Sequence, residues 1–196
     1  MFQIINAKYL TSSVNTEGML KGGVAEIAIA GRSNVGKSSF INYLTNNSKL
    51  CRTSGDPGRT RMINYFEINN GKFYFVDLPG YGYAKAAHNE INKWADFINI
   101  YLTDNAALKN VFVLIDIRHI PSVLDVQLIN YLNTNNLPFT IIATKADKIT
   151  RSQIRSQINM IAEHLKIGVD NIYVVSAVNK TGKDEILKRV DQIINK

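Results

Sequence analysis

The sequence predicts an α/β fold: a mostly parallel six-stranded sheet with one antiparallel strand and helices on both faces. Three observations lead to this prediction. Short apolar runs alternate with longer amphipathic segments along most of the chain, a glycine-bearing loop follows the first such run, and an Asn-Gly pair joins two β-rich runs. Alternation of strands and helices is typical of parallel sheets covered on both sides, whereas Asn-Gly favours an antiparallel hairpin.

The expected elements follow the apolar patterns in chain order. The expected strands are residues 25–30, 61–68, 72–76, 111–115, 139–143 and 172–175, and the expected helices are residues 38–44, 87–101, 123–133, 151–165 and 184–194. The two strands that flank Asn69-Asn70-Gly71 are expected to pair antiparallel. The sequence has no repeat, linker or break in composition, so we expect one domain of residues 23–196, on which an N-terminal extension of residues 1–22 packs.

Composition and charge narrow the class of protein. With 45% hydrophobic and 20% charged residues in a chain of 196, the sequence is too apolar for a disordered protein. A single cysteine, Cys51, excludes an internal disulfide framework and a cysteine-rich zinc site. No run is long enough to span a membrane and no secretory signal is present, so a cytoplasmic protein without a membrane partner is expected. The net charge of +7 suggests a polyanionic partner such as RNA.

A loop of residues 31–38 carries the strongest motif. Its sequence, Gly-Arg-Ser-Asn-Val-Gly-Lys-Ser, matches the G-x-x-x-x-G-K-[S/T] pattern of phosphate-binding loops and lies between an expected strand and an expected helix. The glycines let backbone N–H groups turn toward phosphate oxygens beside the positive end of the helix. Lys37 is expected to reach the β- and γ-phosphates, and the Ser38 hydroxyl to bind Mg²⁺. The residues expected around the phosphates are Gly31, Arg32, Ser33, Asn34, Val35, Gly36, Lys37, Ser38 and Ser39.

Residues Thr144-Lys145-Ala146-Asp147, directly after the expected strand 139–143, indicate the base of the nucleotide. A carboxylate at Asp147 can accept two hydrogen bonds from the N1–H and N2–H₂ groups of guanine. Adenine has no such donor pair, and leaving the carboxylate unpaired would cost on the order of several kcal/mol. Lys145 is expected to lay its aliphatic stem along the base. The alternative for Asp147 is an ordinary helix N-cap, since a helix is expected to follow.

Two further segments follow expected strands. In Asp77-Leu78-Pro79-Gly80, Asp77 is expected to hold Mg²⁺ through water and the Gly80 N–H to meet the γ-phosphate, and the alternative is a plain Pro-Gly turn. Val175-Ser176-Ala177 lies at the end of the last strand, and the backbone N–H groups of Ser176-Ala177 are expected to touch guanine O6. All these motifs follow strands, where open α/β sheets bind ligands, and their uninterrupted order is typical of GTP-binding proteins.

Longer stretches of the sequence resemble one family. Residues 53–64 contain Pro57-Gly58-Arg59-Thr60, residues 77–84 read Asp-Leu-Pro-Gly-Tyr-Gly-Tyr-Ala, and residues 116–119 read Asp-Ile-Arg-His. Together with the motifs above, they resemble the EngB (YihA/YsxC) family of bacterial ribosome-biogenesis GTP-binding proteins, within the TrmE-Era-EngA-EngB-Septin-like GTPase superfamily. The resemblance extends from about residue 25 to the last helix.

The resemblance implies a P-loop NTPase with a Ras-like G domain that hydrolyses GTP to GDP and phosphate. Such a protein would bind the large ribosomal subunit or its precursor through rRNA, act as a monomeric switch in assembly, and be linked to normal cell division and septation. By position, Ser38 and Thr60 would be Mg²⁺ ligands, and residues 77–80 would begin the second switch segment. The first switch segment would comprise Gly58, Arg59, Thr60, Arg61 and Met62.

Departures from common GTPase patterns bear on hydrolysis. Many GTPases place Gln directly after D-x-x-G to orient the attacking water, but Tyr81 occupies this position, so slow turnover is expected. In potassium-activated relatives resembling MnmE, an Asn at the position of Asn34 helps to hold K⁺ against the phosphates. Here Asn34 either does so or only satisfies backbone groups of the loop. Lys37, Thr60 and Asn34 are the expected catalytic residues. Thr144 replaces the Asn of most GTPases, which removes one amide hydrogen bond.

Two functions remain open from the sequence. Basic residues around the first switch segment, Lys49, Arg52, Arg59 and Arg61, suggest a nucleotide-gated contact with the rRNA backbone. The alternative is a nucleotide-gated binding module for a protein partner in cell division without direct ribosome contact. Binding to RNA is expected to weaken steeply with salt, whereas binding through an apolar protein interface is not.

Overall fold

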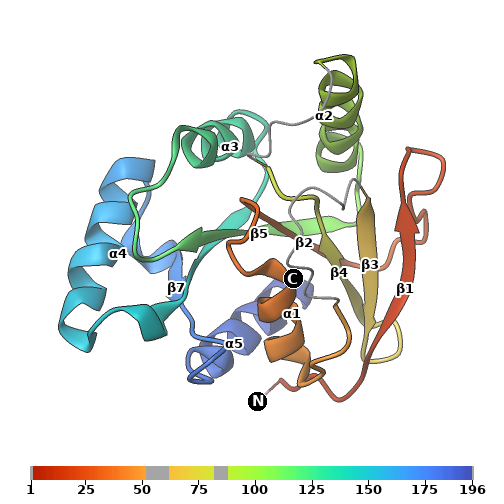
Figure 1. Cartoon of the computed structure of the whole chain (residues 1–196). Coiled ribbons are helices and arrows are strands. Elements are labelled where there is room, and N and C mark those ends of the chain that lie inside the picture. Colours follow the sequence, from red (N-terminus) through yellow and green to blue (C-terminus); the bar gives the residue numbers. More distant parts are fainter. Residues whose placement is uncertain (1, 52–61, 82–87, 196) are drawn as a thin grey trace.

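The computed structural model describes residues 2–51, 62–81 and 88–195, and the side chains in this set apart from those of residues 88–95. At its centre is a seven-stranded sheet in the order β1-β3-β4-β2-β5-β6-β7 (Figure 1). The strands are β1 (Ala7–Ser13), β2 (Glu26–Gly31), β3 (Ile63–Ile68), β4 (Phe73–Asp77), β5 (Leu108–Asp116), β6 (Phe139–Thr144) and β7 (Ile172–Val174).

The directions of the strands agree with those predicted from the sequence. Strand β3 runs antiparallel to both of its neighbours, β1 and β4, whereas β2 pairs parallel with β4 and β5, and β6 pairs parallel with β5 and β7. The α/β class, the mostly parallel sheet and the single antiparallel strand are therefore confirmed, as is the hairpin predicted from Asn69-Asn70-Gly71. The sheet has seven strands instead of six, because β1 extends the predicted set at one edge.

Strand β1 is the element that the sequence analysis did not predict. It is an edge strand, and most of its side chains are exposed or half-buried, so no apolar alternation marks it in the sequence. Pairing with β3 defines it instead. On either side of β1, Phe2 and Met19 pack against the core of the sheet. The division of the chain into an extension and a domain at residue 22 remains a prediction.

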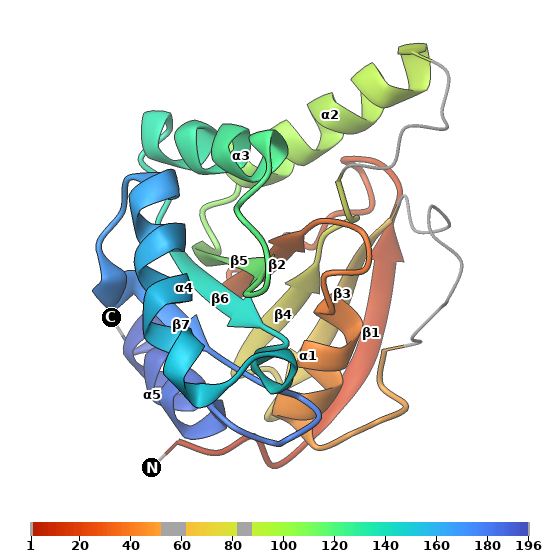
Figure 2. The ribbon, with the colours of Figure 1, turned by 60° about the vertical axis from the view of Figure 1, so that its left-hand side comes forward.

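Helices cover both faces of the sheet (Figure 2). The helices are α1 (Lys37–Thr45), α2 (His88–Thr103), α3 (Val123–Thr134), α4 (Arg151–Leu165) and α5 (Lys183–Ile194), and the 3-10 turns are η1 (Ala146–Lys148) and η2 (Val169–Asn171). Side chains of α2, α3 and α4 pack into one hydrophobic cluster, and those of α1 and α5 pack into another. The five predicted helices are thus present, with ends that differ by up to two residues.

Alternation along β2 shows how one strand serves both clusters. Ile27 and Ile29 point into the cluster under α1 and α5, whereas Ala28 and Ala30 point into the cluster on the opposite face. All four side chains are buried, which explains the continuous apolar run in the sequence. Within the described residues, no helix is both long and apolar enough to cross a membrane.

Candidate functional site

The predicted motifs gather at one edge of the sheet. Residues 32–36 follow β2, residues 78–81 follow β4, residues 145–148 follow β6, and residues 175–177 follow β7. These strands run in the same direction, so their carboxyl ends meet at a common edge. This is the edge at which parallel α/β sheets bind ligands.

The loop after β2 has the backbone shape expected of a phosphate-binding loop. Gly36 is the N-cap of α1 with φ of 109°, a conformation that residues with a Cβ rarely adopt, and Asn34 also has a positive φ of 64°. At Gly31, a Cβ would lie 2.8 Å from Val35 Cγ1 and 3.0 Å from the Leu114 carbonyl oxygen. Glycine is therefore required at residues 31 and 36 for the chain to turn tightly from the strand into the helix.

Thr144, at the end of β6, anchors this loop. Its buried hydroxyl lies 3.0 Å from the Val35 carbonyl oxygen and 3.1 Å from the Ile115 carbonyl oxygen, and it donates to one of them at a time. The sequence analysis expected Thr144 to remove a hydrogen bond that Asn would make. The structure adds that the threonine hydroxyl itself joins the phosphate loop to the centre of the sheet.

Lys145 also reaches the loop from β6. Its ammonium donates to the Asn34 carbonyl oxygen at 2.9 Å and lies 3.0 Å from Asp116 Oδ2. Its backbone is left-handed, with φ of 62°. The side chain therefore extends from the T-K-x-D motif to the phosphate loop, along the space where the sequence places the base.

Asp147 lies in η1 and is oriented by a distant residue. Its Oδ1 accepts a hydrogen bond from the Ser176 hydroxyl at 2.7 Å, and this bond, with help from Lys148, lowers the pKa of the Asp147 carboxyl below its usual value. The alternative role of Asp147 as the cap of the next helix is wrong, because the N-cap of α4 is Thr150. The Asp147 carboxylate is therefore charged and does not cap helix α4.

Ser176 is almost fully buried, and its backbone N–H and its hydroxyl both donate hydrogen bonds within the chain. Its N–H donates to the Thr181 carbonyl oxygen at 3.2 Å, and its hydroxyl donates to Asp147. Of the predicted Ser176-Ala177 pair, the N–H left to meet guanine O6 is therefore that of Ala177. Val175 connects the same turn to the base motif, since its carbonyl oxygen accepts from the Ala146 N–H at 3.2 Å.

Asp77, which is buried, and Lys37, which is half-buried, are oppositely charged groups that affect each other's pKa. Burial raises the pKa of the Asp77 carboxyl to about 6, against the opposing effect of the Lys37 ammonium. Burial likewise lowers the pKa of Lys37, which Asp77 partly offsets. Asp77 Oδ1 is buried and has no hydrogen-bond partner within the described part of the chain. A buried, unsatisfied carboxylate oxygen fits the oxygen ligands that Mg²⁺ prefers, as does the hydroxyl of Ser38 in the first turn of α1.

Residues 80 and 81 rest directly on the phosphate loop. The Ser33 N–H donates to the Tyr81 carbonyl oxygen at 3.1 Å, and a Cβ at Gly80 would lie 3.0 Å from Ser33 N and 3.1 Å from Lys37 Nζ. Glycine at residue 80 thus allows the second switch segment to approach the site closely. The adjoining residues Leu78 and Pro79 are buried.

The Tyr81 side chain reaches the start of α3. Its hydroxyl donates to Asp125 Oδ1 at 2.7 Å, and Asp125 forms the capping box of α3 with Ser122. Burial and the Asp125 carboxylate raise the pKa of the Tyr81 phenol well above its usual range. Tyr81 is therefore a neutral hydrogen-bond donor to α3 in this structure, which the sequence did not predict.

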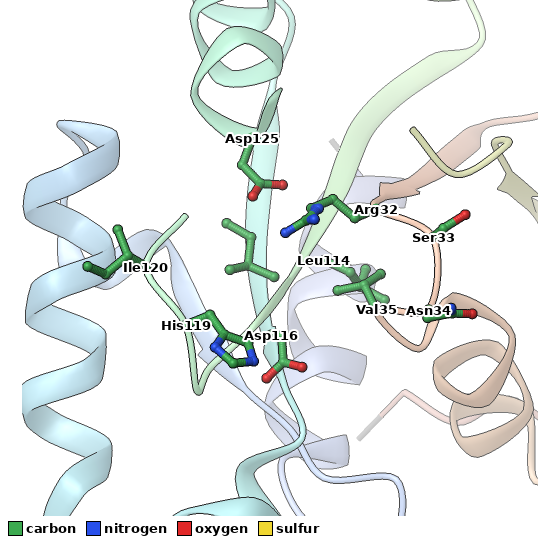
Figure 3. A pocket seen from close by; sticks show the side chains of 10 residues that line it. Arg32, Ser33, Asn34, Val35, Leu114, Asp116, His119, Ile120 and Asp125 are labelled. Carbon is green, nitrogen blue, oxygen red and sulfur yellow. The ribbon is translucent and has the colours of Figure 1, made fainter. Parts of the chain in front are cut away.

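A pocket of about 160 Å³ lies between the phosphate loop and the end of β5 (Figure 3). Figure 3 shows Arg32 and Asp125 on one side of it and Asp116 and His119 on the other.

Met62, from the predicted first switch segment, is 37% exposed just before β3. The other predicted residues of that segment, Gly58, Arg59, Thr60 and Arg61, lie outside the described residues.

Comparison with known proteins shows the family of this chain. A family described as "50S ribosome-binding GTPase" matches residues 26–145. The chain is 44% identical over 194 residues to the probable GTP-binding protein EngB of Clostridium kluyveri, covering 98% of each chain. It is 40% identical over 195 residues to the probable GTP-binding protein EngB of Bacillus subtilis, covering 99% of this chain and all of the relative.

Solved structures of GTP-binding proteins share the fold of this chain. A crystal structure of a probable GTP-binding protein EngB has a TM-score of 0.72 at 28% identity, covering 87% of this chain and 99% of that one. A crystal structure of an Aquifex aeolicus Era variant bound to GDP·AlF₄⁻ has a TM-score of 0.69 at 25% identity, covering 86% of this chain and 56% of that one.

Proposed function

The chain belongs to the EngB family of GTP-binding proteins, and from this premise we propose that it is a GTP-dependent switch in assembly of the large ribosomal subunit. It hydrolyses GTP to GDP and phosphate, as its family and GTPase domain imply. The observation that carries the guanine-nucleotide part of the proposal is the Asp147 carboxylate, which Ser176 orients at the same sheet edge as the phosphate loop, and the description of the matching family supports the ribosomal part.

We propose that each nucleotide part meets a separate segment. Backbone N–H groups of the loop and the Lys37 ammonium bind the phosphates, because loop amides and a helix N-terminus attract anions. The Asp147 carboxylate accepts from guanine N1–H and N2–H₂, the Ala177 N–H donates to O6, and the Lys145 stem covers the base. Adenine has no donor pair for Asp147, so the site discriminates against ATP.

Mg²⁺ is the proposed metal cofactor, held by Ser38 and Thr60 and, through water, by Asp77. The buried and unsatisfied Asp77 Oδ1 supports this assignment. Bound there, the ion would neutralise charge on the β- and γ-phosphates. The Lys37 ammonium contributes a second positive charge from within the chain, and Gly80, which approaches the loop closely, is proposed to donate its N–H to the γ-phosphate.

Slow hydrolysis follows from the position of Tyr81. Its hydroxyl is bonded to Asp125 and its phenol is held neutral, so it does not act as a base toward water. Charge stabilisation must therefore come from other groups. We propose K⁺ bound at Asn34 as that source, since Asn34 is an exposed loop residue whose carbonyl oxygen is held by Lys145.

Potassium activation predicts a cation-specific rate. Single-turnover hydrolysis is expected to be about tenfold faster in KCl than in NaCl at equal ionic strength, because a bound cation stabilises charge on the phosphates. Asn34→Ala is expected to abolish the difference. Asn136→Ala is the matched control, because Asn136 is also exposed with a positive φ, of 54°, but lies in the α3–β6 connection. Equal wild-type rates in both salts would mean that Asn34 only satisfies backbone groups.

The large subunit, through its rRNA, is the proposed partner. The net charge of +7 supports a polyanionic partner, and the matching family is described as ribosome-binding. We further propose a cytoplasmic monomer that is linked to cell division and septation through ribosome assembly. In this account the bound nucleotide sets the conformation of the switch segments, and that conformation sets affinity for the subunit.

Co-sedimentation with purified large subunits tests this proposal. Binding is expected to be at least about tenfold tighter with a non-hydrolysable GTP analogue than with GDP, and to weaken steeply as salt rises. Absence of binding in both nucleotide states, with GTP still bound normally, would exclude the subunit as partner.

A protein partner in cell division is the second candidate function. The observation that favours it is a group of exposed apolar side chains at the start of α3, where Ile120 is 62%, Val123 is 72% and Leu124 is 40% exposed. This group adjoins the Tyr81–Asp125 contact, so it could respond to the second switch segment. A nucleotide-dependent complex that survives high salt would favour this function over the ribosomal one.

A further inference from the structure

Asp116, the last residue of β5, is the centre of a chain of charged contacts. The Arg118 guanidinium binds it with two bonds, Nε to Oδ1 at 2.9 Å and Nη2 to Oδ2 at 2.7 Å. The Arg118 backbone N–H adds a third contact to Oδ1 at 3.2 Å. On the other side, the Lys145 ammonium lies 3.0 Å from Oδ2. Asp116 therefore links an exposed arginine to the lysine of the base motif.

The carboxylate remains an anion in this setting. Burial favours its neutral form, but the hydrogen bonds from Arg118 and Lys145 outweigh burial and hold the pKa of Asp116 well below its usual range. The side chain of Asp116 is 15% exposed, whereas those of Lys145 and Arg118 are 31% and 38% exposed. A fixed negative charge thus faces the ammonium of the partly exposed Lys145 side chain.

Lys145 contacts two parts of the site. Its backbone is left-handed, with φ of 62°. Its ammonium makes a second bond, to the Asn34 carbonyl oxygen of the phosphate loop at 2.9 Å. The same side chain thus borders the expected base and touches the loop around the expected phosphates.

We propose that Asp116, fixed by Arg118, is a positioning residue for nucleotide binding, which holds Lys145 across the base and against the phosphate loop. The inference rests on the guanine-nucleotide site proposed above, but not on the ribosomal partner. Asp116 touches no nucleotide atom in this account and acts only through Lys145. It adds no base selectivity, because discrimination between bases belongs to Asp147.

A purely structural role for Asp116 makes a different prediction. Its carboxylate also bonds the Arg118 N–H, and its carbonyl oxygen accepts from the His119 N–H at 3.2 Å, so it helps to form the turn after β5. If that were its whole role, removing its charge would perturb the site regardless of Lys145. The two roles differ in whether the effects of Asp116 and Lys145 are coupled.

A double-mutant cycle on GDP affinity and dissociation rate separates them. Asp116→Asn keeps the shape of the side chain and removes its charge, and Lys145→Met keeps the stem and removes the ammonium. Asp116→Asn is expected to weaken GDP about five- to tenfold in the wild-type background, but less than about twofold in the Lys145→Met background. The ratio of GDP to IDP affinity is expected to stay unchanged. Asp170→Asn is the control, because Asp170 is an exposed carboxylate in η2.

Arg118→Gln gives a second, independent measurement, because Arg118 lies at the surface and its loss should not prevent folding. It is expected to weaken GDP about threefold, again only when Lys145 is present. An equal loss in both Lys145 backgrounds, or no loss from either variant, would overturn the inference. Failure of the wild-type chain to bind GDP would instead overturn the nucleotide site itself, and the inference with it.

Discussion

Asp147→Asn is expected to convert the guanine site into a xanthine site. The carboxylate accepts two hydrogen bonds from guanine, so an amide at this position leaves a clash of donors against the N2–H₂ group. GDP affinity should fall by about a hundredfold or more, since each charge-assisted bond contributes about 1.5–3 kcal/mol. Xanthine has an oxygen at C2, to which the new amide can donate, so XDP affinity should rise by a similar factor. Competitive titration with GDP and XDP measures both.

The hydrogen bond from the Ser176 hydroxyl is expected to survive the Asp147→Asn substitution. It donates to Asp147 Oδ1 in the structure and can donate equally to an asparagine oxygen, so the substitution should preserve the local fold. Asp170→Asn is the matched control, with no expected effect on either nucleotide. If Asp147→Asn left the preference for GDP intact, Asp147 would not read the base, and the assignment of guanine specificity would fail.

Lys37→Met is expected to weaken both GDP and GTP by about a hundredfold or more. The half-buried Lys37 ammonium interacts with the Asp77 carboxylate, and methionine keeps the length of the stem while removing the charge that is expected to face the phosphates. The substitution also leaves the Asp77 carboxylate without its counter-charge, which adds repulsion toward phosphate. Equilibrium titration with both nucleotides measures the loss.

Lys49→Met is the matched control for Lys37, because Lys49 is an exposed lysine outside the phosphate loop. Its removal should change nucleotide affinity by less than about twofold, as expected of a screened surface charge. A loss below about tenfold for Lys37→Met, with the protein folded, would mean that the loop N–H groups hold the phosphates with little help from the lysine.

Local chemistry explains which parts of the fold could be predicted. The phosphate loop was predictable because its strand, its glycines at 31 and 36 and its helix are adjacent in sequence, and the structure shows why each is needed. The buried strands were predictable because both of their faces lie in the core. Strand β1 was not, because an edge strand with mostly exposed side chains needs no apolar pattern, and its paired residues in β3 lie 50 to 61 positions away in the sequence.

The fine structure of the site depends on contacts between distant residues. The Ser176 hydroxyl meets Asp147 across 29 residues, the Tyr81 hydroxyl meets Asp125 across 44, and the Thr144 hydroxyl meets Val35 across 109. Each motif predicts where its own residues lie relative to the sheet. In each of these three pairs, however, the two residues belong to different segments of the chain, so neither segment alone predicts the contact. For Asp147, both the guanine and the helix-cap roles fit the local sequence. The N-cap at Thr150 excludes the helix-cap role, and the guanine role stays a prediction.

The most direct test of the switch is to let an orthogonal nucleotide control binding to the large subunit. The Asp147→Asn variant is co-sedimented with purified large subunits in the presence of non-hydrolysable analogues of XTP or GTP, or of XDP. Subunit binding is predicted with the XTP analogue alone, whereas the wild-type chain should respond only to the GTP analogue. Binding that is the same with every nucleotide, in a variant that does prefer xanthine, would show that the nucleotide site does not gate the partner and would contradict the account.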